Sequence, residues 1–171
     1  GTATVVVTAL GNAEAILSGV NIAGTLTYNN LTGNPTLAGT TVIIPTNASS
    51  TIVTVDTKTF TGTAAQLTGV VTNGGGTTAV TDLEDTLAAD LSTLNTTTQT
   101  AAFAGDATFT GNMGSATVNI TSGKMVATAA VLAGATITGN EVEVTALENT
   151  ETANLSSISV TTTTIVDTNN D

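Results

Sequence analysis

Residues 63–69 of this chain spell Thr-Ala-Ala-Gln-Leu-Thr-Gly, and residues 128–134 return to nearly the same motif as Thr-Ala-Ala-Val-Leu-Ala-Gly. A looser copy, Ala-Glu-Ala-Ile-Leu-Ser-Gly, stands at 13–19. The leucines of the two closest copies are 65 positions apart. Self-similarity at a long period is typical of proteins whose structural units stack on one another.

The composition of the motif predicts one or two turns of helix between strands. The threonine is a good N-cap and the two alanines allow close packing on a sheet. The leucine fills the core, and the glycine provides the left-handed exit from the helix. A structural role therefore explains each residue of the motif.

A second matching pair lies downstream, at 80–86 and 144–150. In the first copy Thr81 and Glu84 have the spacing of a capping box, and four leucines follow at helical spacing, Leu83, Leu87, Leu91 and Leu94. The sequence therefore predicts an α-helix over 81–94. The corresponding stretch 145–158 has Glu151 in place of the second leucine, so we expect its helix to be shorter or absent.

Most of the remaining chain favours strands. About a quarter of the residues are threonine, and β-branched side chains fit a pleated sheet well. Glycine, asparagine and proline separate the short apolar runs. These expected strands are 2–10, 20–28, 40–44, 51–60, 107–110, 116–121, 124–129, 135–138, 141–145 and 159–167.

The pattern predicts a mainly β fold with one or two short helices, built as stacked or solenoid-like β units, with a β-sandwich as the alternative. Few aromatic residues, 2% of the chain, favour stacked units over a sandwich. Gly74-Gly75-Gly76 is expected to be a flexible joint between a β-rich first unit, 1–73, and a second unit of helix plus β-strands, 77–171.

Composition excludes several classes of function. The net charge of −11, with two lysines and no arginine, argues against nucleic acid and anionic lipid as partners. No apolar run is long enough to cross a bilayer, so we expect no membrane insertion. Without histidine or cysteine, the common nucleophile–base pairs and transition-metal sites are unavailable, and the carboxylates at 82–90 are explained as a helix N-terminus and a solvated face. We expect no enzymatic activity.

Calcium is the one cofactor with a physical case, because it takes oxygen ligands and this chain is rich in them. Carboxylates gather in the last 31 residues. We name as candidate calcium ligands Glu141, Glu143, Glu148, Asp167 and Asp171. The alternative is that Glu141 and Glu143 simply face solvent from an alternating strand.

The order of motifs resembles repeat units of very large secreted bacterial surface proteins, namely S-layer proteins and adhesins of the RTX type. The resemblance is carried by Gly-Thr-Ala-Ala-Gln-Leu-Thr-Gly at 62–69 and by the 80–95 segment, each next to a strand, and it covers about residues 53–166. It implies an extended β-rich shaft or lattice domain, often stiffened by calcium. The chain departs from that pattern at 74–77, where Thr77 rather than aspartate follows the glycines, so the calcium signature of those repeats is missing there.

The sequence thus predicts an extracellular, cell-surface structural protein: a self-assembling subunit or fragment of a surface layer, filament or adhesin shaft. Self-association is expected through strand edges. Residues 2–8 and 159–166 are the segments expected to supply these edges, because both are apolar, threonine-rich and free of strand-breaking residues. The alternatives are an ice- or glycan-binding β module and a phage fibre segment. The ice-binding alternative ranks lower, since the Thr-x-Thr pairs at 25/27, 57/59, 108/110 and 136/138 lack a short regular period.

Overall fold

The computed structural model describes residues 5–7, 26–28, 51–54, 59–147 and 152–166, with the backbone alone described in the first three segments. Its strands are β1 (Val5–Val7), β2 (Leu26–Tyr28), β3 (Thr51–Thr54), β4 (Thr59–Thr63), β5 (Val71–Thr81), β6 (Leu94–Ala104), β7 (Ala107–Thr108), β8 (Thr117–Thr128), β9 (Thr136–Thr145) and β10 (Ile158–Ile165). The helices are α1 (Ala64–Leu67), the 3-10 turn η3 (Leu83–Asp85) and α2 (Ala129–Leu132). The described chain is therefore mainly β, as the sequence predicts.

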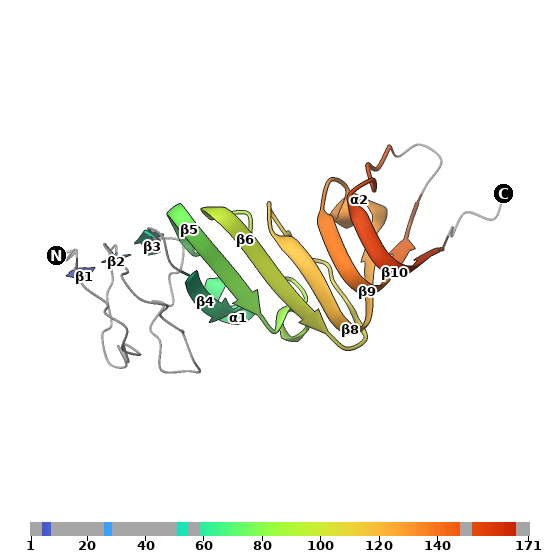
Figure 1. Ribbon diagram of the computed structural model, residues 1–171, viewed down its shortest axis with the longest axis horizontal. Coiled ribbons are helices and arrows are strands. Elements are labelled where there is room, and N and C mark those ends of the chain that lie inside the picture. Colours follow the sequence, from blue (N-terminus) through green and yellow to red (C-terminus); the bar gives the residue numbers. More distant parts are fainter. Residues whose placement is uncertain (1–4, 8–25, 29–50, 55–58, 148–151, 167–171) are drawn as a thin grey trace.

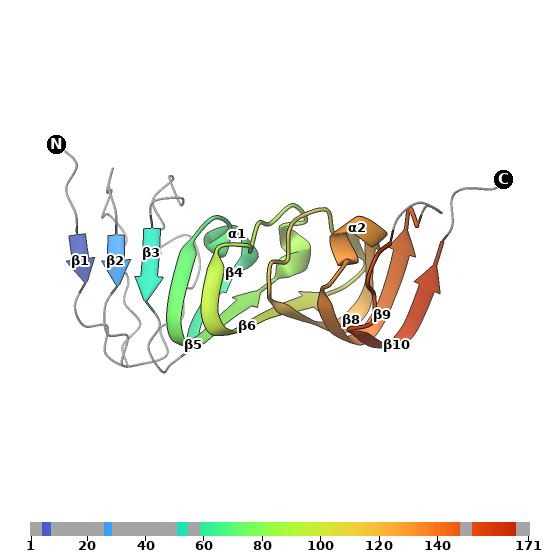
Figure 2. The same ribbon diagram turned by 90° about the horizontal axis from the view of Figure 1, so that it is seen from above.

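All described strands belong to one sheet in which each pairing is parallel. The strand order is β1-β2-β3-β5-β6-β8-β9-β10, with β4 also on β5 and β7 also on β8. Neighbours in the sheet follow the order of the chain, so β1 and β10 lie at opposite ends of the long axis (Figures 1 and 2).

The register explains the long sequence period. Paired residues lie between 17 positions apart, at Thr100–Thr117, and 25 positions apart, at Leu26–Thr51. In the turns, the amide of Gly69 bonds the carbonyl of Asp90, 21 positions on, and Asp90 bridges to Asn112 after 22 more. Three steps of about this size cover the 65 positions between the two leucines of the motif.

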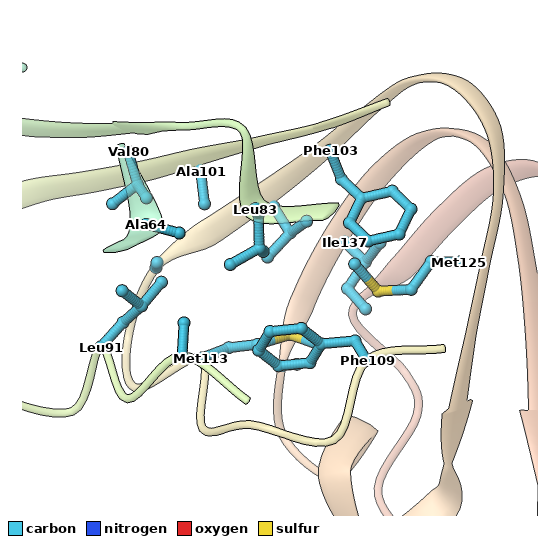
Figure 3. Close-up of a cluster of buried hydrophobic side chains, with 14 of the residues drawn as sticks. Ala64, Val80, Leu83, Leu91, Ala101, Phe103, Phe109, Met113, Met125 and Ile137 are labelled. Carbon is cyan, nitrogen blue, oxygen red and sulfur yellow. The ribbon is translucent and has the colours of Figure 1, made fainter. Parts of the chain in front are cut away.

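Alternation along the strands places the core on one side of the sheet. In β4, β5 and β8 buried side chains alternate with half-buried or exposed ones over long stretches, as the two-residue period of a strand requires. Three phenylalanines are the largest buried side chains, and Figure 3 shows Phe103 near Met125 and Ile137. Leucine, valine, isoleucine and alanine make up most of the rest.

The two short helices have the local structure that the motif predicts. Thr63 accepts a hydrogen bond from the Gln66 amide (3.3 Å), and the Gln66 side chain accepts one from the Thr63 amide (3.0 Å), which completes a capping box. In α2 the Thr128 hydroxyl accepts from the Val131 amide (3.3 Å). Both helix leucines are fully buried. Gly69 and Gly134 follow at φ of 72° and 77°, the left-handed conformation that glycine adopts at little cost.

The prediction of a helix over 81–94 is wrong. Thr81 is the last residue of β5, Asp82 has a left-handed backbone (φ 55°) with no capping bond, and only Leu83–Asp85 are helical, as a single 3-10 turn. The Glu84 carboxylate accepts from the amide of Ala104 (2.8 Å) instead of closing a capping box. Leucines 83, 91 and 94 are buried, yet Leu87 is 38% exposed. Leu83 and Leu91 are buried in separate turns, and Leu94 is buried as the first residue of β6. The helical spacing of these leucines is therefore a coincidence.

The glycines of the predicted joint lie within a strand. Gly74–Gly76 lie inside β5, where the pairing with β6 shifts register between Gly74 and Thr77. The sheet therefore continues across the boundary expected between 1–73 and 77–171. The residues on either side of this register shift include three buried threonines. The Thr96 hydroxyl donates to Thr78 (2.9 Å), and the Thr78 hydroxyl donates to Thr72 (3.2 Å).

The other predicted strands are longer or shorter than expected. Segments 116–121 and 124–129 merge into β8, and 135–138 and 141–145 merge into β9. Segment 159–167 appears as β10, while 107–110 contains only the two residues of β7. Segment 51–60 contributes β3 and the start of β4, and segment 40–44 lies outside the described residues. Within 145–158 the residues that the structure describes form no helix before β10.

Candidate functional site: the outer face of the sheet and its last strand

The predicted calcium ligands divide into two groups. Glu141 and Glu143 lie on β9 with half-buried side chains that alternate with the buried Val142 and Val144. Both therefore face outward, as the solvent-facing alternative expects. Glu148, Asp167 and Asp171 lie outside the described residues.

Lys124 neutralises part of this acidic surface. Its ammonium group lies 2.6 Å from the Glu143 carboxylate, and the backbone amide of Lys124 bonds Asp106 (2.8 Å). The hydrogen bond and charge of Glu143 raise the pKa of Lys124, with smaller contributions from Glu141 and Asp106. Glu143 is thus already paired with a cation. Among the side chains that the structure describes, no three potential metal ligands come together.

Two carboxylates of the 82–90 segment hold the backbone in place. Glu84 holds the backbone of β6 at Ala104. The side chain of Asp90 accepts the Ser92 amide (3.0 Å) in a tight turn. Hydrogen bonds from the Ser92 hydroxyl and amide lower the pKa of Asp90 below its ordinary value of 3.8, against a small opposing effect of burial.

A groove of about 410 Å³ separates the loop before β8 from α2. It is lined by residues 111–114 on one side and by Ala130, Val131 and 133–135 on the other. These side chains are glycine, alanine, valine, methionine and one asparagine. The groove offers backbone groups and one amide, which are not the groups of acid–base or nucleophilic catalysis.

A threonine face lies on the outside of the sheet. Its members are outward side chains from part of β4, β5, β6, β8 and β9 and from the start of β10: Thr59, Thr61, Thr63, Thr77, Ala79, Thr81, Thr98, Thr100, Ala102, Thr117, Asn119, Thr136, Thr138 and Ser159. All are half-buried or exposed. Ten of the fourteen are threonine and none carries a charge, so this face offers hydroxyl and methyl groups with a single amide, that of Asn119.

Strand register arranges the threonine face in columns. One column runs Thr59, Thr77, Thr98. A second contains Thr100, Thr117 and Thr136 and continues on the other side through Ala79 to Thr61. Sequence reasoning missed these columns because it looked for a short regular period, whereas the threonines stack at unequal offsets. The signal that could have found them is threonine recurring 17–21 positions apart within alternating strands.

The last strand, β10, is the second distinctive surface. Its register matches Ile158, Thr163 and Ile165 to the core positions Ile137, Val142 and Val144 of β9. Those three β9 side chains are fully buried. On β10, Ile158 is half-buried, Thr163 is exposed and Ile165 is 56% exposed. The core thus reaches the surface at this end of the molecule.

No helix of the described residues is long and apolar enough to span a membrane. Searches against protein families, curated proteins and solved structures gave no match to this chain.

Proposed function

We propose that this chain is an extracellular structural protein, a self-assembling subunit or fragment of a surface layer, filament or adhesin shaft, built as a parallel β-solenoid. The observation that carries the proposal is the stepwise parallel pairing that ends in β10, a strand whose core-facing side chains are half-buried or exposed. In a stacked array each unit buries its apolar face on the next, so the face of the last unit stays exposed. Natural arrays normally cover that face with a polar capping unit.

The character of β10 supports association at this end. Terminal strands of soluble sheets are usually protected by charged residues, proline or a covering segment. Residues 158–165 read Ile-Ser-Val-Thr-Thr-Thr-Thr-Ile, without a charge or proline. In the described residues β10 pairs with β9 alone. Its outer edge therefore favours the addition of another strand.

Charge sets the conditions for assembly. At a net charge of −11 copies repel each other, and salt or a divalent cation would reduce that repulsion. Calcium held by Glu141, Glu143, Glu148, Asp167 or Asp171 remains part of the proposal, and Lys124 would compete with it for Glu143. Titration of the chain with calcium chloride, compared with magnesium chloride at equal ionic strength, separates specific binding from screening.

The test is light scattering coupled to size exclusion, with electron microscopy of the same samples, on the full chain and two lysine variants. Thr163→Lys places a charge on a core-facing position of β10, while Ser115→Lys adds the same charge at an exposed loop position. We expect the wild type and Ser115→Lys to form elongated multimers and Thr163→Lys to remain monomeric. A wild type that stays monomeric at all salt and calcium concentrations contradicts the proposal. Immunogold labelling of intact producing cells tests the surface location.

The threonine face favours a second candidate, an ice- or glycan-binding module. Neighbouring parallel strands lie about 4.8 Å apart, and alternate residues about 6.6 Å apart along a strand, so the columns form a regular grid of hydroxyl and methyl groups. Thermal hysteresis and pull-down on insoluble glycans test this candidate. Thr100→Lys should abolish either activity while Ser115→Lys retains it, and wild-type protein without either activity removes the candidate.

A further inference from the structure

We infer that copies of this chain join head to tail, with β1 of one copy adding in parallel to the free edge of β10 of the next. This inference rests on the proposed self-assembly and adds its polarity and its partner strand. The result is an open filament, because a contact between two different surfaces does not close on itself unless its rotation forms a ring.

The two ends of the sheet are complementary. β1 occupies the first place in the strand order and β10 the last, and both run parallel to all strands between them. Within the described residues β1 pairs only with β2. Its sequence, Val5-Val6-Val7, is uncharged and β-branched, which suits a strand with neighbours on both sides. Placed against β10, β1 would continue the same sheet with the same strand direction.

The exposed core favours a partner that brings its own core. Ile158, Thr163 and Ile165 correspond to buried residues in the preceding strand, so they would be covered by another turn of chain on the same side of the sheet. A second copy entering through β1 carries its following strands, β2 and β3, in the same parallel order. That order makes a second copy a suitable cover for this end.

Pairing of β10 with β10 is less compatible with this geometry. A two-fold axis perpendicular to the sheet would make the two strands antiparallel. A two-fold axis along the strands would keep them parallel but place the two cores on opposite sides of the sheet. Only the contact between β10 and β1 preserves both the parallel direction and the side on which the core lies.

The absence of cysteine from the sequence allows a direct test by cross-linking. Thr162→Cys marks β10 at an outward position, opposite the half-buried Glu141. Val5→Cys and Val6→Cys mark β1, and one of the two faces outward because successive side chains point to opposite sides of a strand. Each variant is assembled alone, and Thr162→Cys is also assembled with an equal amount of each β1 variant, before treatment with a short bis-maleimide. Ser115→Cys is the control for random collision.

We expect cross-linked dimers when Thr162→Cys is combined with one of the β1 variants, in at least tenfold higher yield than with Ser115→Cys or with any variant alone. Multimers in which Thr162→Cys cross-links mainly to itself would overturn the head-to-tail inference and leave self-assembly standing. Multimers without a cross-link from either β1 variant would also overturn it, provided that both variants still co-sediment with wild type. If the wild type forms no multimers, both the inference and the proposed function fail.

Discussion

The leucines of the two matching motifs, 63–69 and 128–134, occupy equivalent buried positions. Leu67 and Leu132 each close a short helix over the core, and each is fully buried. Removing buried methyl groups costs the transfer free energy together with the energy of the cavity left behind. We therefore expect Leu67→Ala and Leu132→Ala each to lower the free energy of unfolding by about 2–5 kcal/mol in urea denaturation.

Leu87 provides the matched control for these two leucines. It is 38% exposed, so Leu87→Ala should change the free energy of unfolding by less than about 1 kcal/mol. If one of the two buried leucines proves silent while the other unfolds the chain, the two motifs do not play equivalent parts.

Asp90 makes stability depend on pH at a single turn. Its pKa is lowered in the folded state by the hydrogen bonds from Ser92, so the folded chain binds fewer protons than the unfolded chain near pH 3.8. The stabilisation by Asp90 is present above that pH and is lost as the pH falls through the folded pKa. Asp90→Asn keeps an acceptor for the turn but removes this dependence.

Asn112 shows that an asparagine side chain can hold an equivalent turn. Its side-chain oxygen accepts the backbone amide of Gly114 (3.0 Å), just as the Asp90 carboxylate accepts the backbone amide of Ser92. Thermal melts from pH 7 to pH 2 should show the difference between wild type and Asp90→Asn shrinking below about pH 4. A difference that stays constant over this range would show that the charge of Asp90 does not stabilise the turn.

At the scale of the element, helix capping separates the true helices from the one that does not form. Thr63 and Thr128 accept hydrogen bonds from the amides of residues three positions on, whereas Thr81 donates to the neighbouring Asp82 at the surface. Thr63→Ala and Thr128→Ala should each cost about 1 kcal/mol. Thr81→Ala should cost clearly less, since no cap is lost.

The same urea experiment measures all three threonine variants. Equal losses for Thr81→Ala and Thr63→Ala would contradict the observed end of β5 at Thr81 and favour a capped helix there instead. The comparison is sensitive because the substitution removes the same atoms at each position.

At the scale of the whole molecule, the proposed head-to-tail assembly assigns control of association to the terminal strands. Deleting residues 1–10 removes β1, which takes no part in the pairings of β5 to β10 or in the buried core. The truncated chain should therefore remain folded and lose its multimers. Circular dichroism tests its folding, and light scattering tests its mass; normal assembly of the truncated chain would show that β1 is not needed.

Salt dependence of the intact chain tests the electrostatic part of this mechanism. Raising the ionic strength from about 0.01 M to about 0.15 M shortens the Debye length from about 30 Å to about 8 Å. Because the copies repel at a net charge of −11, multimers should increase over this range. A decrease would indicate that attraction between opposite charges, rather than strand addition, holds the copies together.

The sequence by itself determined the features that depend on neighbours within a few positions. Threonine and valine predicted strands, and the capping threonines and the glycines after them predicted α1 and α2, because caps and left-handed exits involve residues at most four or five positions apart. Alternation along the strand also gave the alternative in which Glu141 and Glu143 face solvent, and in the structure both face outward.

Only the tertiary structure decided which distant residues meet. The four leucines of 83–94 fit a helix, but Leu83 and Leu91 are buried in separate turns because β5 and β6 extend into the segment from either side. The threonine columns and the exposed core of β10 depend on pairing between residues 17–22 positions apart. Those offsets vary from strand to strand with the length of each turn and bulge, so they follow from the pairing of the whole sheet and are not encoded in any local pattern.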